Sequence, residues 1–421
     1  MEQEKKVFLK NFIWNILGTG LNSFNSLFFL IIVTRINGVN DAGIFSICYA
    51  TALILYTVGL YSGRLCQVTD IEKKVKDKDY ILNRIISCVI MMILAVCFVF
   101  IKGYTTYKLW VCILLCLYKA TEAFAEILYG IMQKNEFLYK SGQSLTIKSL
   151  AGLLVFLIVD LITKNLIISI LAAVLVNILT MLTFDFIIVK KLVDKNEKIT
   201  ISNVVNVFKT EFFVFANSFA GIYVLNAPKY AIDSYLTEDM QAMFGYIIMP
   251  ATVITLFTQF IFMPCLNKLT EFYENKNMKD FKGLAFKIKA CVLGFGVLAT
   301  GAAYLLGPEV LKIIYGVDEL LNYRINLCII IASHIFYAMS YINLVLLTTT
   351  RNTFVQFVIY VITMIVACIG SNILVKTNGI NGATLSCTVT LFTQFVLYVI
   401  ITKIIFHKIE KRFEEESNQK A

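Results

Sequence analysis

Long apolar segments recur along the whole sequence and constrain its fold more than any other feature. Twelve of them, each close to the roughly 20 residues that cross a membrane as a helix, are separated by short charged or Gly-containing breaks. Hydrophobic residues make up 58% of the 421 residues and charged residues only 16%, whereas soluble domains are about 25% charged. This pattern excludes a soluble enzyme, a nucleic-acid-binding domain and a disordered chain. It predicts an all-α polytopic membrane protein.

The flanking charges predict how the chain crosses the membrane. Most of the 38 Lys and Arg residues, with Arg84 and Lys148 counted among them, fall in the N-terminal segment, the loops from even to odd spans, and the C-terminal tail. Short cytoplasmic loops carry an excess of Lys and Arg, so we expect both termini to be cytoplasmic. This asymmetry accounts for most of the net charge of +10. The twelve spans are predicted at residues 12–34, 43–65, 84–101, 107–130, 145–163, 165–189, 209–231, 241–265, 284–306, 323–348, 352–374 and 380–405.

A faint internal repeat suggests two halves. Residues 12–51 can be laid on residues 211–250, and a polar tip precedes the second span of each half. Repeated halves with a binding site between them are a recurring transporter plan. We therefore expect an N-terminal six-helix lobe at 1–190, a cytoplasmic linker at 191–208, a C-terminal six-helix lobe at 209–406 and a charged cytoplasmic tail at 407–421.

Several signatures of enzymes are missing from the sequence. It contains no G-x-x-x-x-G-K-[ST] motif for nucleotide phosphates, and no outward loop is long enough to suggest an acceptor-binding domain for glycan chemistry. The 11 cysteines lie mostly in apolar stretches without C-x-x-C spacing, and only two histidines are present, so a metal cluster is not expected. We predict no catalytic residue, no metal and no cofactor.

Charged residues inside a span are costly and usually face a cavity or a partner. Lys119, Glu122 and Glu126 are spaced i, i+3 and i+7 in the predicted fourth span, on one helical face. Lys119 could contact a substrate phosphate, with the carboxylates balancing its charge. The alternative is a self-neutralised triad that fixes this helix to a neighbour, and the sequence leaves both open.

Other cations lie near the predicted membrane boundaries. Arg35 closes the first span at its outer end and Arg64 closes the second at its inner end, while Lys229 follows Pro228 in the seventh, with Asp233 one turn later. Guanidinium and ammonium groups bind pyrophosphate strongly in a partly dry cavity, so we expect Arg35, Arg64 and Lys229 to be uncompensated cavity cations. The alternative is that these long side chains extend to the lipid headgroups.

A stripe of amides follows the first span. Asn15, Asn22 and Asn25 share one broad face of the predicted helix. Amides both donate and accept hydrogen bonds, so the stripe suits a hydroxyl-rich sugar in a watery cavity. Hydrogen bonding between helices is the alternative.

Three short stretches of the sequence resemble a known family. They are Asn11, Trp14-Asn15, Gly18, Arg35, Gly38 and Ala42-Gly43-Ile44-Phe45; Gly63-Arg64 with Gln67-Val68-Thr69-Asp70; and Asn378-Gly379-Ile380-Asn381-Gly382-Ala383. The first stretch resembles the start of Wzx-type polysaccharide flippases, the second a segment of their Gram-positive capsule branch, and the third the G-[IL]-x-G-A turn that enters span twelve. These flippases belong to the multidrug/oligosaccharidyl-lipid/polysaccharide (MOP) exporter superfamily.

The resemblance implies both an architecture and a cargo. Two six-helix lobes would form a V around a central cationic cavity that opens to alternate sides of the cell membrane. The cargo would be an oligosaccharide on undecaprenyl pyrophosphate, moved to the outer leaflet for capsule, O-antigen or other surface polysaccharide. Such a flippase would act as a monomer in the lipid bilayer, alongside a polysaccharide polymerase and a chain-length regulator. Arg35, Arg64, Lys119 and Lys229 are assigned to the cavity by their placement in this sequence, not by a family motif.

Two other functions remain as alternatives. A MATE-like drug or cation antiporter of the same superfamily would be expected to carry an acidic residue in its first span, and residues 12–34 have none. A membrane-embedded glycan polymerase or transferase is the lesser alternative. Because the chain carries no ATPase motif, a gradient would have to drive transport, and Glu122, Glu126 and Asp233 are the candidates for ion coupling.

Overall fold

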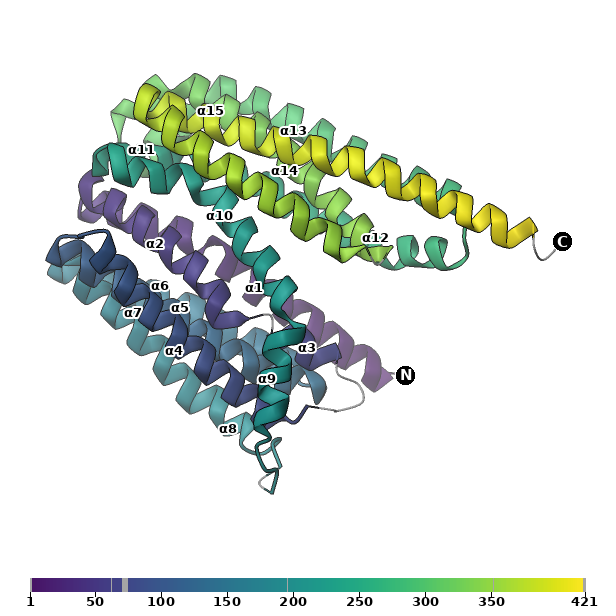
Figure 1. Cartoon of the computed structure of the whole chain (residues 1–421). Helices are drawn as coiled ribbons and strands as arrows, with labels where there is room; N and C mark the ends of the chain where they lie inside the picture. The colour runs from purple at the N-terminus through teal and green to yellow at the C-terminus, as the bar shows by residue number, and fades with distance from the viewer. Residues whose placement is uncertain (1, 62, 70–74, 195, 351, 419–421) are drawn as a thin grey trace. The chain divides into compact units, whose positions relative to one another are not determined.

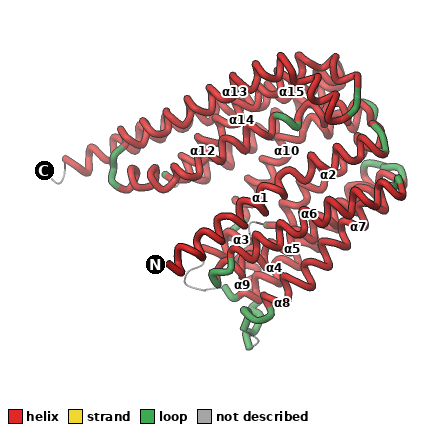
Figure 2. The backbone as a smooth tube through the Cα atoms, turned by 180° about the vertical axis from the view of Figure 1, so that it is seen from behind, coloured by secondary structure: helices red, strands yellow, loops and turns green. Residues whose placement is uncertain are grey.

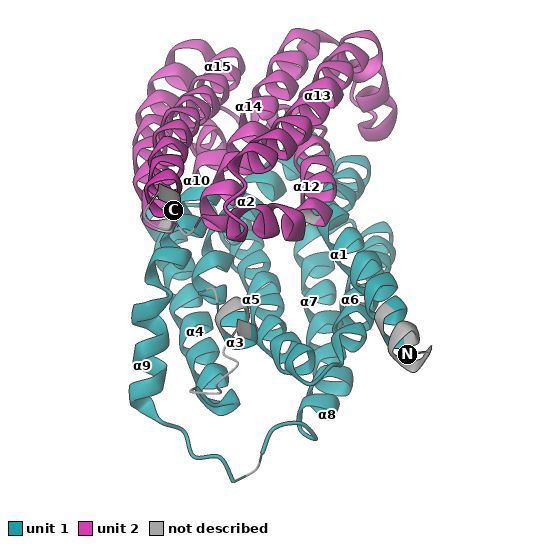
Figure 3. Cartoon of the chain, turned by 90° about the vertical axis from the view of Figure 1, so that its right-hand side faces the viewer, with its two compact units in different colours: residues 1–222 teal, residues 223–421 magenta. Residues whose placement is uncertain are grey.

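Helices form nearly all of the described chain. The computed structural model describes residues 2–61, 63–69, 75–194, 196–350 and 352–418, and within these ranges the chain forms helices and no strands (Figures 1 and 2). The predicted all-α fold is confirmed. The chain divides into two compact units, residues 1–222 and 223–421, which are coloured separately in Figure 3.

Unit 1 is built from antiparallel helices joined by short turns. Helices α1 and α6, α2 and α5, and α6 and α7 pack along much of their length. The seventh helix continues through a π-helical turn, Met181–Asp185, before it ends. The helices of this unit are α1 (Glu2–Ile36), α2 (Val39–Leu60), α3 (Gly63–Thr69), α4 (Asp77–Ile101), α5 (Thr106–Lys134), α6 (Leu138–Thr163), α7 (Leu166–Thr180), α8 (Phe186–Val189) and α9 (Ile201–Thr210).

Unit 2 has longer helices, and α14 packs along α12, α13 and α15. Helix α10 (Phe212–Tyr235) crosses from unit 1 into unit 2. The last helix is broken at Gly379, whose φ of 57° and ψ of −134° are not helical. The remaining elements are α11 (Glu238–Ile248), α12 (Ala251–Glu274), α13 (Met278–Tyr315), a 3₁₀ turn (Asp318–Tyr323), α14 (Arg324–Thr349) and α15 (Thr353–Asn418).

The described helices account for all twelve predicted spans. In the part of the chain that the structure describes, nine stretches are long and apolar enough to cross a membrane. One of them, Phe354–Glu416, covers nearly all of the two spans predicted on either side of Gly379. The other two predicted spans correspond to α5 and α10, which are not among the nine. Helix α5 is too highly charged in its middle, where Lys119, Glu122 and Glu126 lie. The residues that make this helix a poor membrane span are therefore the ones that build the candidate site.

Two glycines allow α1 and α6 to approach closely. A Cβ added at Gly142 would lie 2.5 Å from the carbonyl carbon of Trp14, and one at Gly18 would lie 2.7 Å from the carbonyl oxygen of Gly142. Small residues at such crossings bring helix backbones together in membranes. The amide face of α1 is thereby pressed against the polar face of α6.

The stretch between the predicted lobes contains a helix. Helix α9 lies within and just beyond the linker expected at 191–208, and it packs on α4. Asp79 of α4 accepts hydrogen bonds from the Thr200 backbone N–H at 2.7 Å and from Asn203 Nδ2 at 2.9 Å. The stretch expected as a charged tail, 407–421, is helical through Asn418.

Candidate functional site

A buried polar cluster lies inside unit 1, centred on α5. Thr105 caps the start of this helix by accepting a hydrogen bond from the Lys108 backbone N–H. The helix then carries Lys119 and Glu122 into the interior, where Lys119 Nζ lies 2.7 Å from Glu122 Oε2, with side chains only 6% and 10% exposed. A charge pair this dry is retained only when each partner is satisfied. Lys119 therefore has its own carboxylate.

Three tyrosine rings surround the Lys119 ammonium. Its Nζ lies 5.0 Å from the ring centroid of Tyr49, 5.6 Å from that of Tyr56 and 5.5 Å from that of Tyr118. Aromatic faces attract cations within about 6 Å. The rings therefore add to the attraction that Glu122 exerts on the buried ammonium.

Glu126 pairs with a different cation, so Lys119, Glu122 and Glu126 do not form a single triad. Arg64 Nη1 lies 2.7 Å from Glu126 Oε2, and Arg64 Nη2 donates to Gln133 Oε1 at 3.1 Å. The prediction that Arg64 is an uncompensated cation is wrong, because the carboxylate one turn beyond Glu122 reaches it. The predicted position of Arg64 at the end of the second span is also wrong, because α2 ends at Leu60 and Arg64 lies in α3.

A second buried pair was missed in the sequence. Lys148 Nζ lies 2.5 Å from Asp185 Oδ2, and the Asp185 side chain is 0% exposed. Lys148 also donates to Tyr129 Oη at 3.0 Å, and this hydroxyl lies 3.0 Å from Ser144 Oγ. Lys148 was counted with a loop, but α6 begins at Leu138 and buries it. Asp185 is a lone carboxylate inside the apolar sixth span, and this placement could have indicated that it has a buried cationic partner.

Arg84 is a further buried cation. It was also counted with a cytoplasmic loop, yet it lies in α4 and is only 1% exposed. Its Nη1 donates to the Gly59 carbonyl oxygen at 2.5 Å, and its Nε has no hydrogen-bond partner in the described ranges. A Cβ on Gly63 would lie 3.1 Å from Arg84 Nη2, so the guanidinium is beside the start of α3.

These pairs give the cluster an excess of positive charge. With every group ionised, four cations face three carboxylates. Within the cluster is a small cavity of about 10 Å³, which is room for about one water molecule. In this conformation it cannot admit a sugar. The buried polar cluster comprises Arg64, Arg84, Lys119, Glu122, Glu126, Lys148 and Asp185.

The predicted amide stripe reaches this cluster at one residue. Asn22 lines the small cavity, and its Oδ1 lies 3.4 Å from Asn25 Nδ2. Asn25 is buried beside it, whereas Asn15 is exposed at the crossing of α1 with Gly142. Of the three, the structure brings Asn22 to the polar interior.

The remaining predicted cations lie elsewhere. Arg35 is exposed in the last turn of α1 and does not line the small cavity. Lys229 belongs to unit 2, directly after Pro228 inside α10. It is only 7% exposed, and within the part of the chain that the structure describes it makes no ion pair or hydrogen bond, Asp233 included. A buried ammonium without a partner is energetically costly.

Metal ligands do not gather in the described part of the chain. No group of three or more His, Cys, Asp or Glu side chains there could hold an ion. The cluster offers fixed charges and hydroxyl groups, which suit binding of an anionic or hydroxylated ligand.

Comparison with known proteins identifies the fold. No family model matches the sequence. A multidrug resistance MATE family transporter of the MOP superfamily, in an inward-facing conformation, superposes with a TM-score of 0.74 and 10% identity over 94% of this chain and 99% of that one. The lipid II flippase MurJ, in an inward closed conformation, gives a TM-score of 0.70 and 14% identity over 94% of this chain and 90% of that one. This chain has the fold of the MOP superfamily.

A sequence relative narrows the comparison. The capsular polysaccharide biosynthesis protein CapF of Staphylococcus aureus is 24% identical over 313 residues, which are 73% of this chain and 77% of that protein. The resemblance to MOP superfamily flippases stated from the sequence is confirmed, and the chain is a multi-pass membrane protein. The solved structures that it resembles are transporters and flippases rather than enzymes.

Proposed function

We propose that this protein is a flippase that moves undecaprenyl-pyrophosphate-linked oligosaccharide repeat units across the cytoplasmic membrane for capsule or other surface polysaccharide. The observation that carries the proposal is the similarity to a capsular polysaccharide biosynthesis protein, which extends over 313 residues. The MOP superfamily fold alone does not choose between cargoes, because a multidrug transporter and a lipid II flippase superpose about equally well, with TM-scores of 0.74 and 0.70.

The charge distribution supports an anionic cargo. The described part of α1 from Leu9 to Ile36 contains no carboxylate, and the buried polar cluster has more cations than carboxylates. Lys229 adds a buried cation in unit 2. Fixed positive charge in a dry site attracts a pyrophosphate and repels a lipophilic cation.

The lipid tail also needs a path. An apolar groove of about 640 Å³ runs between α4 and α5 of unit 1, with Val89, Ile93 and Phe124 among its walls. A prenyl chain can pack against such an apolar surface and against the surrounding lipid. The sugars and pyrophosphate require shielding from hydrocarbon because unpaired polar groups are costly there.

In this proposal transport proceeds by alternating access, with both termini in the cytoplasm. Glu122 and Glu126 are the proposed ion-coupling carboxylates of unit 1, and Asp233 that of unit 2. In the described conformation Lys119 already pairs with Glu122 and Arg64 with Glu126. A coupling proton would therefore compete with an internal cation and release Lys119 or Arg64 toward the cargo.

A MATE-like antiporter is the second candidate. The observation in its favour is the TM-score of 0.74 with a multidrug transporter. In that function, Glu122 or Glu126 would bind a proton or metal cation in exchange for an organic cation. The surplus of buried cations argues against such a cargo.

Lys119 provides the test of the proposal. Lys119→Met leaves Glu122 as a buried unpaired carboxylate, which by itself lowers stability, so the matched variant is Lys119→Met with Glu122→Gln. We expect the paired variant to reach normal membrane abundance and to fail to bind undecaprenyl-pyrophosphate oligosaccharide in nanodiscs, while Lys119→Arg retains part of the binding. Full binding by the double variant would show that Lys119 is not part of the binding site.

A further inference from the structure

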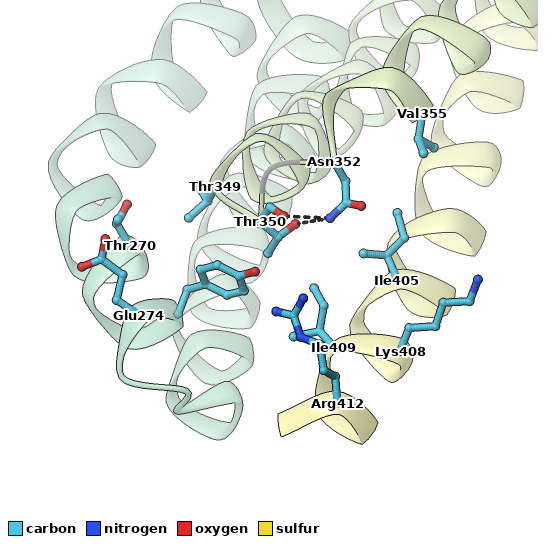
Figure 4. Close-up of a pocket in the computed structure, with 11 residues that line it drawn as sticks. Thr270, Glu274, Thr349, Thr350, Asn352, Val355, Ile405, Lys408, Ile409 and Arg412 are labelled. Atoms are coloured by element: carbon cyan, nitrogen blue, oxygen red, sulfur yellow. Dashed lines mark hydrogen bonds between the residues drawn. The ribbon is translucent and has the colours of Figure 1, made fainter. Parts of the chain in front are cut away.

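Unit 2 contains a large cavity, lined by both polar and apolar side chains, at one end of its helix bundle. The cavity has a volume of about 760 Å³ and is enclosed by the end of α12, the turn between α14 and α15, and the C-terminal part of α15 (Figure 4). At this turn Asn352 Nδ2 donates to the Thr350 carbonyl oxygen at 2.8 Å and to the Thr350 hydroxyl at 3.2 Å. These hydrogen bonds connect the two lining residues that flank residue 351.

The opposite wall presents cationic donors that the protein itself does not use fully. Arg412 extends into the cavity from α15, and Lys408 lines its rim one turn earlier with its side chain directed away from the Arg412 guanidinium (Figure 4). Arg412 Nε lies 3.7 Å from Glu416 Oε1, and in the described ranges its Nη atoms make no hydrogen bond. Lys408 likewise forms no ion pair there.

Two carboxylates of the last helix are engaged by other lysines. Lys276 pairs with Glu416 and Lys282 pairs with Glu410. Glu274 is the carboxylate that lines the cavity. The cavity therefore carries a net positive charge with the donor geometry of a guanidinium, which matches a phosphate group.

The cavity also has an apolar wall. Val355, Ile405 and Ile409 line the side formed by the two arms of α15. Ile405 is the last residue of the predicted twelfth span, so this wall lies at the level where hydrocarbon gives way to headgroups. The combination of an apolar wall and a cationic wall fits a ligand that has both a hydrocarbon and a phosphate part.

We propose that this cavity binds the headgroup of an anionic phospholipid from the adjacent leaflet. Arg412 holds the phosphate, Lys408 adds positive charge at the rim, the Tyr273 hydroxyl supplies a neutral donor, and the first part of the acyl chains lies against Ile405 and Val355. A soluble phosphate would use the same two cations but gain nothing from the apolar wall. Basic groups near an anionic membrane surface contribute about 1 kcal/mol each, or about fivefold in affinity.

Bound lipid would hold together three parts of unit 2 that are distant in sequence. The ligand would contact α12 through Tyr273, the turn at Thr350 and the end of α15 at Arg412. The site is separate from the buried polar cluster of unit 1, and lipid binding can be measured without transport. Failure of this proposal would leave the proposed flippase function intact, and the converse also holds.

Native mass spectrometry of the delipidated full chain tests the proposal. The protein is titrated with phosphatidylglycerol or phosphatidylcholine in detergent, with inorganic phosphate and pyrophosphate as competing soluble anions. We expect preferential binding of phosphatidylglycerol, with affinity lowered about fivefold by Arg412→Gln or Lys408→Gln. Lys411→Gln is the matched control, because it removes the same charge from an exposed neighbour that does not line the cavity.

The possible outcomes distinguish a lipid headgroup from a soluble phosphate as the ligand of the cavity. Arg412→Lys, which keeps the charge, should retain most of the binding and so exclude misfolding as the cause of the loss. Glu274→Gln should increase the affinity. An equal loss of phosphatidylglycerol affinity in Lys411→Gln would show that the lipid is attracted by the basic surface in general, and it would overturn the proposed site. Complete displacement by inorganic phosphate, or equal binding of phosphatidylcholine, would overturn the assignment to an anionic lipid.

Discussion

The Lys148–Asp185 pair makes a quantitative prediction about stability. At 2.5 Å and an effective dielectric of 20, the Coulomb attraction is about 7 kcal/mol, and desolvation of both groups offsets most of it. Asp185→Asn leaves the Lys148 ammonium buried with Tyr129 Oη as its remaining partner. Loss of one member of a buried pair costs about 3–5 kcal/mol, and the retained tyrosine places the expected loss near 3 kcal/mol.

Replacement of both Lys148 and Asp185 should lower the free energy of unfolding far less than Asp185→Asn alone. Lys148→Met combined with Asp185→Asn removes both charges and keeps similar volumes, so we expect a loss of less than about 1.5 kcal/mol. The free energy of unfolding can be measured by titrating the purified protein from mild detergent into SDS. Glu410→Gln is the control, since it breaks an exposed pair with side chains 43% and 33% exposed and should cost less than about 1 kcal/mol. The reasoning fails if Asp185→Asn costs no more than Glu410→Gln, or if the double variant is worse than either single one.

Three further predictions test other parts of the account. Reporter fusions after Lys279 should report cytoplasm and fusions after Glu238 the exterior; reversal of both would refute the topology. Lys229→Met should raise the free energy of unfolding by about 1–3 kcal/mol, because it removes a buried unpaired charge, and should lower transport; unchanged stability would contradict the burial argument. Gly142→Ala should cost about 1–3 kcal/mol through a clash with the α1 backbone, whereas Gly152→Ala, with open space around it, should be neutral in the same SDS titration.

The helices could be predicted from the sequence because the length of an apolar segment can be read directly along the chain. Every predicted span corresponds to a described helix or to one arm of α15. The charges of α5 were also found from sequence, since a lysine and two glutamates within an apolar helix stand out. The break in α15 at Gly379 was visible as a short polar turn.

Partners across helices could not be predicted. Glu126 finds Arg64 at a separation of 62 residues, and Lys148 finds Asp185 at 37. Which cation meets which carboxylate depends on helix rotation and crossing, and these are set by packing at positions such as Gly142. Arg84 and Lys148 were counted with loops because they lie at the start of the predicted spans 84–101 and 145–163, whereas α4 begins at Asp77 and α6 at Leu138. A few residues there decide between a surface charge and a buried one.

Direct transport in proteoliposomes tests the central claim most directly. Vesicles containing the protein and an undecaprenyl-pyrophosphate oligosaccharide labelled on its sugar are prepared, and the fraction of label on the outer face is followed with a membrane-impermeant quencher. The account predicts protein-dependent movement of the labelled lipid, loss of that movement in the Lys119→Met, Glu122→Gln variant, and no movement of ethidium. Transport of ethidium driven by a proton or sodium gradient, with the labelled lipid remaining in its original leaflet, would contradict it.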